Sequence, residues 1–182
     1  MAAKATPQRM LWAVETLAPG PDDHLLEIGC GPGVAVSLIC EKLVGGRIVG
    51  IDRSATAIGR AAKRNAEHIS SGKAVLRTMA LEKLRPADVL QGRQRFDKIF
   101  AMNVNLFWVR RPTKELNLIK RLLGPGGALY LFYGYGGPPE PGKASENAAR
   151  VPGVLTDKLT ECGFAVEVKR AASVVCVVAT PK

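Results

Sequence analysis

The sequence contains few of the residues that build metal, redox or base-stacking sites. Its 182 residues include only two histidines and four cysteines, and aromatic residues make up 5% of the chain. The cysteines lie far apart, at positions 30, 40, 162 and 176, so the spacing of a zinc site is absent and no metal is expected. We expect the cysteines to be small, buried hydrophobic residues.

Long apolar runs are absent as well. No run approaches the ~18 to 20 residues that a membrane-spanning helix needs, and residues 1–9 lack the apolar core of a secretory signal. Hydrophobic residues at 47% and charged residues at 23% are typical of a globular protein. We therefore expect a single cytoplasmic domain over residues 1–182, with no membrane partner.

The charge of the chain is unbalanced. Lysine and arginine number 26 against 16 acidic residues, which gives a net charge of +10 and favours anionic partners, including nucleic acid and anionic substrates. Basic residues are dense between Arg85 and Arg121, where only Asp88, Asp97 and Glu115 are acidic. This stretch is interpreted either as a solvated face or as a nucleic-acid surface, although few aromatic residues are there to stack on bases.

Segments of strand length alternate with amphipathic segments of helix length. The patterns predict strands at 24–28, 47–51, 73–78, 96–101, 128–133, 164–170 and 174–180, and helices at 6–18, 34–44, 54–69, 113–123 and 154–162. Such alternation predicts a mostly parallel sheet with helices on both faces. The last two strands follow each other closely and should form an antiparallel hairpin. Ligands bind such sheets at the carboxyl ends of the strands.

The first predicted strand runs into a glycine-rich turn, EIGCGPG at residues 27–33. Glycines at alternate positions allow a tight turn and a close approach of a ligand to the backbone, and the next helix would point its N-terminus at that ligand. Asp52 ends the next strand, where a carboxylate can accept hydrogen bonds from both hydroxyls of a ribose. A dinucleotide-binding GxGxxG motif would need a glycine at the position of Val34, which disfavours a nicotinamide enzyme.

Together with three further segments, this turn resembles the class I S-adenosylmethionine-dependent methyltransferases. The segments are residues 25–33 (LLEIGCGPG), 49–52 (VGID), 96–99 (FDKI) and 122–129 (LLGPGGAL), in the order and at the spacing of that family. The resemblance implies a Rossmann-like three-layer α/β/α fold whose seven-stranded, mostly parallel sheet has the order 3-2-1-4-5-7-6, with the last strand antiparallel. It also implies S-adenosyl-L-methionine as the cofactor and S-adenosyl-L-homocysteine as the product. The helix at about 6–18 and the loop at 134–143 would cover the site.

The resemblance also implies roles for single residues. Glu27 and the backbone of the glycine turn would hold the amino-acid part of the cofactor, Asp52 its ribose, and Arg53 would flank the adenine. Many members carry an acidic residue after the third strand, where this chain has Met79 and Ala80 with Glu82 later, so backbone groups and apolar packing are expected to hold the adenine. The predicted cofactor-binding residues are Glu27, Gly29, Cys30, Gly31, Gly33, Asp52, Arg53, Met79, Ala80 and Asn103.

The sequence does not assign the catalytic residues. Asn103 and Asn105 follow the fourth predicted strand, and Tyr133 and Tyr135 lie at the end of the fifth, so all four are candidates by topology alone. No general base can be named, and methyl transfer can proceed without one because alignment of the reactants supplies much of the barrier reduction.

The sequence therefore predicts transfer of a methyl group to an O, N or C atom of a small-molecule acceptor. One alternative is an RNA or DNA methyltransferase that uses the basic surface at 85–121. Another is a non-catalytic S-adenosylmethionine-binding protein, which the missing adenine-side acid and the absent base would suit. A chain of this length leaves little room for an inserted substrate domain. The acceptor site should accordingly be shallow or completed by another subunit, which is compatible with a homo-oligomer.

Overall fold

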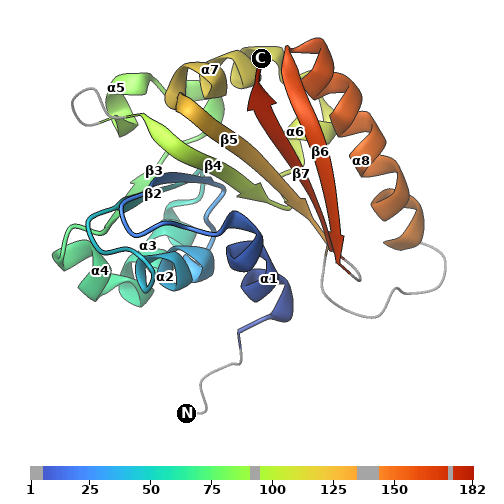
Figure 1. Ribbon diagram of the computed structural model, residues 1–182. Helices are drawn as coiled ribbons and strands as arrows, with labels where there is room; N and C mark the ends of the chain where they lie inside the picture. The colour runs from blue at the N-terminus through green and yellow to red at the C-terminus, as the bar shows by residue number, and fades with distance from the viewer. Residues whose placement is uncertain (1–5, 91–94, 135–143, 172–173) are drawn as a thin grey trace.

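Seven strands form one sheet (Figure 1), seen in a computed structural model that describes residues 6–90, 95–134, 144–171 and 174–182. The sheet order is β3-β2-β1-β4-β5-β7-β6, and β7 runs antiparallel to both of its neighbours. The predicted order, the antiparallel last strand and the final hairpin are thus confirmed. The strands are β1 (His24–Ile28), β2 (Arg47–Asp52), β3 (Ala74–Thr78), β4 (Phe96–Met102), β5 (Leu123–Tyr133), β6 (Phe164–Ala171) and β7 (Val174–Pro181).

Helices cover both faces of the sheet. On one face, α1 and α2 bury their apolar residues against the strands, with α3 beside them. On the other face lie the short elements η1, α5 and α6 and the longer helices α7 and α8. The bounds are α1 (Gln8–Leu17), α2 (Val34–Cys40), α3 (Ala55–Arg64), α4 (Ala66–Ser70), η1 (Leu81–Lys83), α5 (Pro86–Val89), α6 (Leu106–Val109), α7 (Thr113–Leu122) and α8 (Ala144–Glu161). No helix in the described ranges is long and apolar enough to cross a bilayer.

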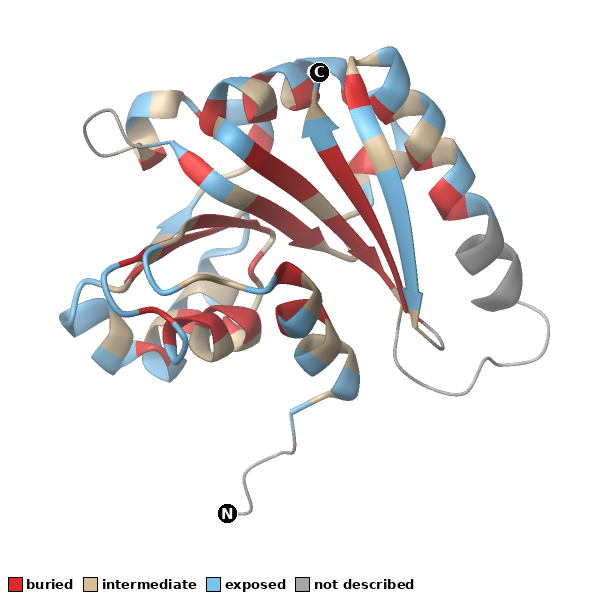
Figure 2. Cartoon of the chain, viewed as in Figure 1, coloured by how far each residue is buried: buried red, intermediate tan, exposed pale blue. Residues whose placement is uncertain are grey.

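Alternate residues of each central strand supply the two halves of the core. Leu25 and Phe100 pack toward α1 and α2, whereas Leu26 and Ile99 pack toward α7 and α8, because successive side chains of a strand point to opposite faces. Figure 2 shows the central strands as buried, in contrast to β6, which is largely exposed. This edge strand carries charged residues, which discourage pairing with another sheet edge.

Three of the helices differ from their predicted bounds by four residues or more. The helix predicted at 34–44 ends at Cys40. The helix predicted at 54–69 is interrupted at Asn65, whose buried side-chain amide donates hydrogen bonds to the carbonyls of Ala61 (2.9 Å) and Gly33 (3.0 Å). The helix predicted at 154–162 begins at Ala144, and Pro152 lies inside it. A proline inside a helix removes one backbone hydrogen bond and clashes with the preceding turn, so this helix continues through a residue that ordinarily interrupts one.

The fifth strand also begins earlier than predicted, at Leu123 instead of residue 128. Its pairing with β4 shifts register between Phe96 and Lys98, so residues 124–127 form an irregular segment of the strand. Three of these four residues are glycines and the fourth is a proline. This composition predicts a turn, but glycines also accommodate a bulge within a strand.

Candidate functional site

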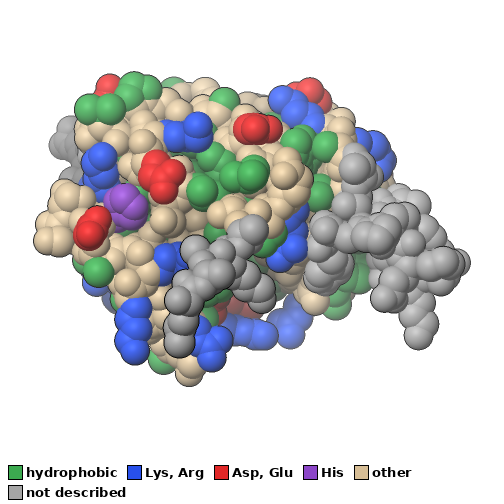
Figure 3. Space-filling view, turned by 90° about the horizontal axis from the view of Figure 1, so that it is seen from below, with side chains coloured by type: hydrophobic (Ala, Val, Ile, Leu, Met, Phe, Trp, Pro, Cys, Tyr) green, Lys and Arg blue, Asp and Glu red, His purple; other side chains and the backbone are tan. Residues whose placement is uncertain are grey.

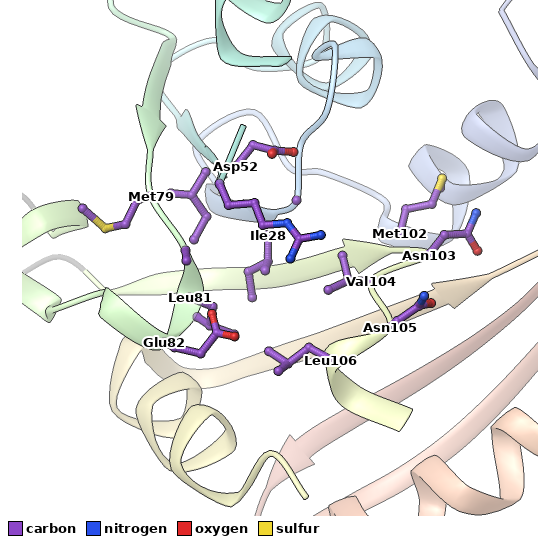
Figure 4. A pocket seen from close by; sticks show the side chains of 14 residues that line it. Ile28, Asp52, Met79, Leu81, Glu82, Met102, Asn103, Val104, Asn105 and Leu106 are labelled. Atoms are coloured by element: carbon purple, nitrogen blue, oxygen red, sulfur yellow. The ribbon is translucent and has the colours of Figure 1, made fainter. Parts of the chain in front are cut away.

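A cavity of about 350 Å³ lies at the carboxyl ends of β1, β2 and β4 (Figure 4). This edge is where parallel sheets bind ligands, and the strand order reverses between β1 and β4. Figure 4 shows Met79, Leu81 and Glu82 on one side of the cavity and the segment from Met102 to Leu106 on the other. The lining residues are Ile28, Gly29, Ile51, Asp52, Arg53, Met79, Ala80, Leu81, Glu82, Met102, Asn103, Val104, Asn105 and Leu106.

The glycine turn is held against the end of β2. The backbone N–H groups of Gly29 and Cys30 both donate to the carbonyl of Ile51, at 2.8 and 3.0 Å. Gly29, Gly31 and Gly33 have φ angles of 73°, 52° and 72°, in the left-handed region that favours glycine. The turn from β1 into α2 therefore depends on three glycines that other residues would strain.

The surroundings of Gly31 and Gly33 are different. A Cβ atom at Gly33 would lie 2.6 Å from Nδ2 of Asn65 and 2.9 Å from the Cβ of Ala61, whereas a Cβ at Gly31 would have no atom within 4 Å. Gly33 thus allows α2 and α3 to pack closely. Gly31 borders open space that a ligand can enter.

We expect Gly33→Ala and Gly31→Ala to have separable effects. Gly33→Ala should lower the free energy of unfolding by about 2 to 4 kcal/mol, because overpacking adds to the strain of a positive φ. Gly31→Ala should cost only about 1 kcal/mol, from its φ angle, but it should weaken ligand binding because the new methyl group occupies the open space. Urea denaturation and calorimetric titration measure the two effects. Equal losses of stability would contradict this assignment.

Glu27 is buried near the end of β1 and directly precedes Ile28 and Gly29, which line the cavity. Its side chain is 3% exposed, and its Oε2 atom has no hydrogen-bond partner among the described residues. Burial, with repulsion from the Asp52 carboxylate as a smaller cause, raises the pKa of Glu27 to about 8. A buried carboxylate with an unpartnered oxygen is costly unless a cation or a hydrogen-bond donor reaches it.

Asp52 connects the two loops that border the cavity. Its Oδ2 accepts a hydrogen bond from the backbone N–H of Gly31 at 2.9 Å, and its Oδ1 accepts one from Ser54 at 2.8 Å. Ser54 in turn caps α3 by accepting a hydrogen bond from the N–H of Ala57. Because each carboxylate oxygen has two acceptor positions, both oxygens retain capacity for a ligand hydroxyl.

The loop after β3 supplies a mainly apolar wall. The backbone N–H of Met79 donates to the carbonyl of Asp52 at 2.8 Å, which fixes this loop beside the end of β2. Leu81 is buried, and Glu82 adds a carboxylate to the cavity lining. These two residues belong to η1, a single turn that the sequence pattern did not predict.

The loop after β4 is held by side chains from two strand ends. Asn103 has a φ of 53°, and its amide donates to the carbonyl of Gly134 (2.9 Å) and accepts from the N–H of Gly134 (3.0 Å). The hydroxyl of Tyr133 donates to the carbonyl of Val104 at 2.7 Å, and burial raises the pKa of Tyr133. Asn105 accepts a hydrogen bond from Nε1 of Trp108 at 3.2 Å. These contacts indicate that Asn103, Asn105 and Tyr133, three of the four candidate catalytic residues, hold the loop after β4 in position.

The structure brings seven of the residues singled out by the sequence into the lining, which are Gly29, Asp52, Arg53, Met79, Ala80, Asn103 and Asn105. Glu27, Gly31, Gly33 and Tyr133 are not among the lining residues, and Tyr135 lies outside the described residues. Cys30 is buried, as are Cys40 and Cys176, while Cys162 is half-buried. Burial raises the pKa of Cys30, which suits a core residue whose backbone alone serves the turn.

Two segments, the helix at about 6–18 and the loop at 134–143, were predicted to cover the site. α1 packs on α2, and its Trp12 lies edge-on to Phe132 with 5.9 Å between ring centroids, but no residue of α1 lines the cavity. Beyond Gly134, residues 135–143 of the predicted loop lie outside the described residues. A covering role for either segment therefore stays a prediction. Sequence reasoning missed Leu81, Val104 and Leu106 as lining residues, because only their place in short turns brings them there.

Comparison with known proteins identifies the family. A family model described as a methyltransferase domain matches residues 26–129. A probable methyltransferase, ltbC, from Aspergillus luteorubrus is 32% identical over 113 residues, which cover 59% of this chain and 38% of that protein. A trans-aconitate 2-methyltransferase from Delftia acidovorans is 29% identical over 106 residues, or 58% of this chain and 36% of that protein. The matched part of the chain thus spans little more than a third of the length of these curated relatives.

A solved structure shows the same fold. The crystal structure of a SAM-dependent methyltransferase from Aquifex aeolicus is similar with a TM-score of 0.73, at 16% identity, over 93% of this chain and 88% of that one. The family model covers more than half of the chain, from β1 and the glycine turn through Asp52 to the first part of β5. The chain therefore belongs to the methyltransferase domain family, and its predicted resemblance to the class I S-adenosylmethionine-dependent methyltransferases is confirmed.

Proposed function

We propose that this chain binds S-adenosylmethionine in the cavity and directs its methyl group to a small-molecule acceptor. The cofactor supplies a methyl group on a positively charged sulfur, which is a good electrophile. The residues present fit this cofactor. The unpartnered Oε2 of Glu27 suits an ammonium group, and the open space at Gly31 admits a ligand against the backbone. Asp52 would hold the ribose hydroxyls, and Met79 and Leu81 would pack against the adenine.

The end of β4 would position the acceptor. Asn103 and Tyr133 fix the loop that carries Val104 and Asn105, so this wall of the cavity keeps its shape while the reactants align. Tyr133 donates its proton to a backbone carbonyl and is buried, which makes it a poor general base. Alignment within a fixed wall is the contribution to catalysis that we assign to these residues.

The cavity has room for the cofactor but for little of an acceptor. At about 350 Å³ it lies near the lower end of the ~300 to 1,000 Å³ range of small-molecule sites, so one ligand of cofactor size fills most of it. The acceptor would then bind at the rim. A nucleic acid would need a continuous basic surface there, and several basic side chains of the 85–121 stretch have other partners. Arg85 pairs with Asp88, Lys98 pairs with Asp23, and Lys120 lies over the ring of Phe164.

A transfer assay with labelled cofactor tests this function. The protein would be incubated with methyl-labelled S-adenosylmethionine and, separately, a panel of small carboxylic acids, phenols and amines, total RNA, and duplex DNA. We expect S-adenosylhomocysteine formation and label in small molecules only. Label in RNA or DNA at about 150 mM salt would contradict the proposal. Binding of the cofactor without transfer to any acceptor would favour a non-catalytic binding protein.

A further inference from the structure

The glycine turn is held from the side of α3 as well as from β2. Nε of Arg64 donates to the carbonyl of Pro32 at 3.1 Å, and Nδ2 of Asn65 donates to the carbonyl of Gly33 at 3.0 Å. Two successive residues at the end of α3 thus bond to two successive carbonyls of the turn. Figure 1 shows α3 beside α2, the helix into which this turn leads. The turn is therefore fixed to two different elements of the fold.

Asn65 is the more unusual of the two residues. Its side chain is fully buried, and among the charged and amide side chains that the structure describes only Glu27 is buried as well. In Figure 3 lysine and arginine side chains are spread over the visible face, so an exposed arginine such as Arg64 is an ordinary feature. The Oδ1 atom of Asn65 has no hydrogen-bond partner among the described residues. Burying an unpaired acceptor costs free energy, and an apolar residue at this position would avoid that cost.

The hydrogen bonds of the Asn65 amide are not needed to satisfy the backbone. Its Nδ2 also donates to the carbonyl of Ala61 at 2.9 Å, but that carbonyl already accepts a hydrogen bond from the backbone N–H of Asn65 at 3.0 Å. The carbonyl of Gly33 likewise accepts one from the backbone N–H of Ser37 at 3.2 Å. Both carbonyls would therefore stay paired without the amide. What the amide adds is a connection between the turn and α3.

The two sets of bonds hold different halves of the turn. The N–H groups of residues 29–31 bond to the end of β2, whereas the carbonyls of Pro32 and Gly33 bond to the end of α3. Gly31, with open space beside it, lies where the two sets meet. Because glycine residues have many accessible conformations, a turn held on one side alone would have to be ordered when a ligand binds. Ordering a loop at the moment of binding lowers affinity.

We propose that Asn65 is a positioning residue, which holds the glycine turn in its ligand-binding conformation before the cofactor arrives. The proposal rests on the proposed function, because that function assigns the turn to cofactor binding. Asn65 is not among the residues that line the cavity, so its effect on affinity is transmitted through Gly33. A Cβ atom at Gly33 would lie 2.6 Å from Nδ2 of Asn65, so the third glycine of the turn allows the amide to approach.

Two substitutions that remove the amide separate positioning from packing. Asn65→Ala leaves a space in the core, whereas Asn65→Leu keeps most of the side-chain volume. The matched control is Val177→Ala, which lowers stability through a buried residue of β7 that does not line the cavity. Calorimetric titration with S-adenosylhomocysteine gives the affinity of each folded protein, and urea denaturation gives its stability.

We expect both Asn65 variants to bind S-adenosylhomocysteine about threefold to tenfold more weakly than the wild type, the range for the loss of one neutral hydrogen bond. The loss should be similar in the two variants although their stabilities differ. Val177→Ala should be less stable than the wild type and keep its affinity. Unchanged affinity in the Asn65 variants, or a loss of affinity that follows stability across all three variants, would overturn the proposal.

Hydrogen exchange of the ligand-free proteins separates this inference from the proposed function. The amide hydrogens of residues 29–33 should exchange faster in both Asn65 variants, relative to those of β4, and Val177→Ala should not show this change. If the wild type fails to bind S-adenosylhomocysteine, the proposed function is wrong, and exchange in the turn still decides whether Asn65 holds it. If the wild type binds and the Asn65 variants change neither exchange nor affinity, only the inference about Asn65 is overturned.

Discussion

Glu27→Gln is expected to weaken S-adenosylhomocysteine binding at pH 8 by roughly 1.5 to 3 kcal/mol, the range for hydrogen bonds to charged groups. The wild-type carboxylate has a buried Oε2 with no hydrogen-bond partner among the described residues, and the proposed function pairs it with the ammonium group of the ligand. Glutamine preserves the shape of the side chain and removes the charge. The same change should raise the free energy of unfolding of the ligand-free protein near pH 8, because it removes a buried charge that costs stability.

The pH dependence of stability gives the sign of this effect. The folded-state pKa of Glu27, about 8, lies above the ordinary value of 4.5, so between these values the folded protein retains a proton that the unfolded chain has lost. The stabilising contribution is complete below pH 4.5 and is lost as the pH rises through 8, by ~1.4 kcal/mol for each unit of the pKa difference at most. Glu27→Gln should flatten this part of the stability profile.

Urea denaturation at pH 5, 7 and 8.5 measures the profile. The matched control is Glu41→Gln, a substitution at an exposed residue that follows the last turn of α2. The control should follow the wild type at every pH. Cofactor affinity of the wild type should rise with pH toward 8 as Glu27 ionises. Parallel stability profiles for the wild type and Glu27→Gln would show that this carboxyl is not the buried, raised-pKa group described above.

Asp52→Ala should weaken S-adenosylhomocysteine binding by about 1.5 to 3 kcal/mol and also lower stability by roughly 1 to 2 kcal/mol. The carboxylate accepts hydrogen bonds from Gly31 and Ser54, so its removal releases both loops at the cavity as well as a predicted ribose contact. Calorimetric titration gives the change in affinity, and urea denaturation gives the change in stability.

Asp52→Asn separates the two roles of this residue. The amide oxygen can still accept one of the two backbone hydrogen bonds, so most of the stability should be retained, while the charge-assisted contact with the ligand is lost. We expect the loss of affinity in Asp52→Asn to exceed its loss of stability. An unchanged affinity in both variants would mean that the ribose binds elsewhere.

The sheet and the glycine turn could be predicted because their signals are local and periodic. Strand-length apolar runs alternate with helical patterns, and the glycines at 29, 31 and 33 follow a strand directly. The elements η1, α5 and α6 could not be predicted, since three or four residues are too few to show a helical period. The start of β5 was misplaced because its glycines indicate a turn as well as a bulge.

Prediction of the site from the sequence was limited for a similar reason. The position of Asp52 follows from the strand that precedes it, but the roles of Asn103 and Tyr133 depend on contacts with the neighbouring strand end and loop. Leu81 and Val104 line the cavity through loop geometry alone. The unpartnered oxygen of Glu27 is a property of packing, which no sequence pattern records. Sequence reasoning thus placed the candidate residues at one edge of the sheet, and the structure was needed to show which of them line the cavity and which hold the surrounding loops.

The most direct test of the cofactor site is calorimetric titration of the wild-type protein with S-adenosylmethionine and S-adenosylhomocysteine at pH 8, beside a nicotinamide dinucleotide as a control. The account predicts micromolar binding of both sulfur compounds and none of the dinucleotide. No binding of either sulfur compound, in protein whose far-ultraviolet circular dichroism shows the α/β fold, or preferential binding of the dinucleotide, would contradict it.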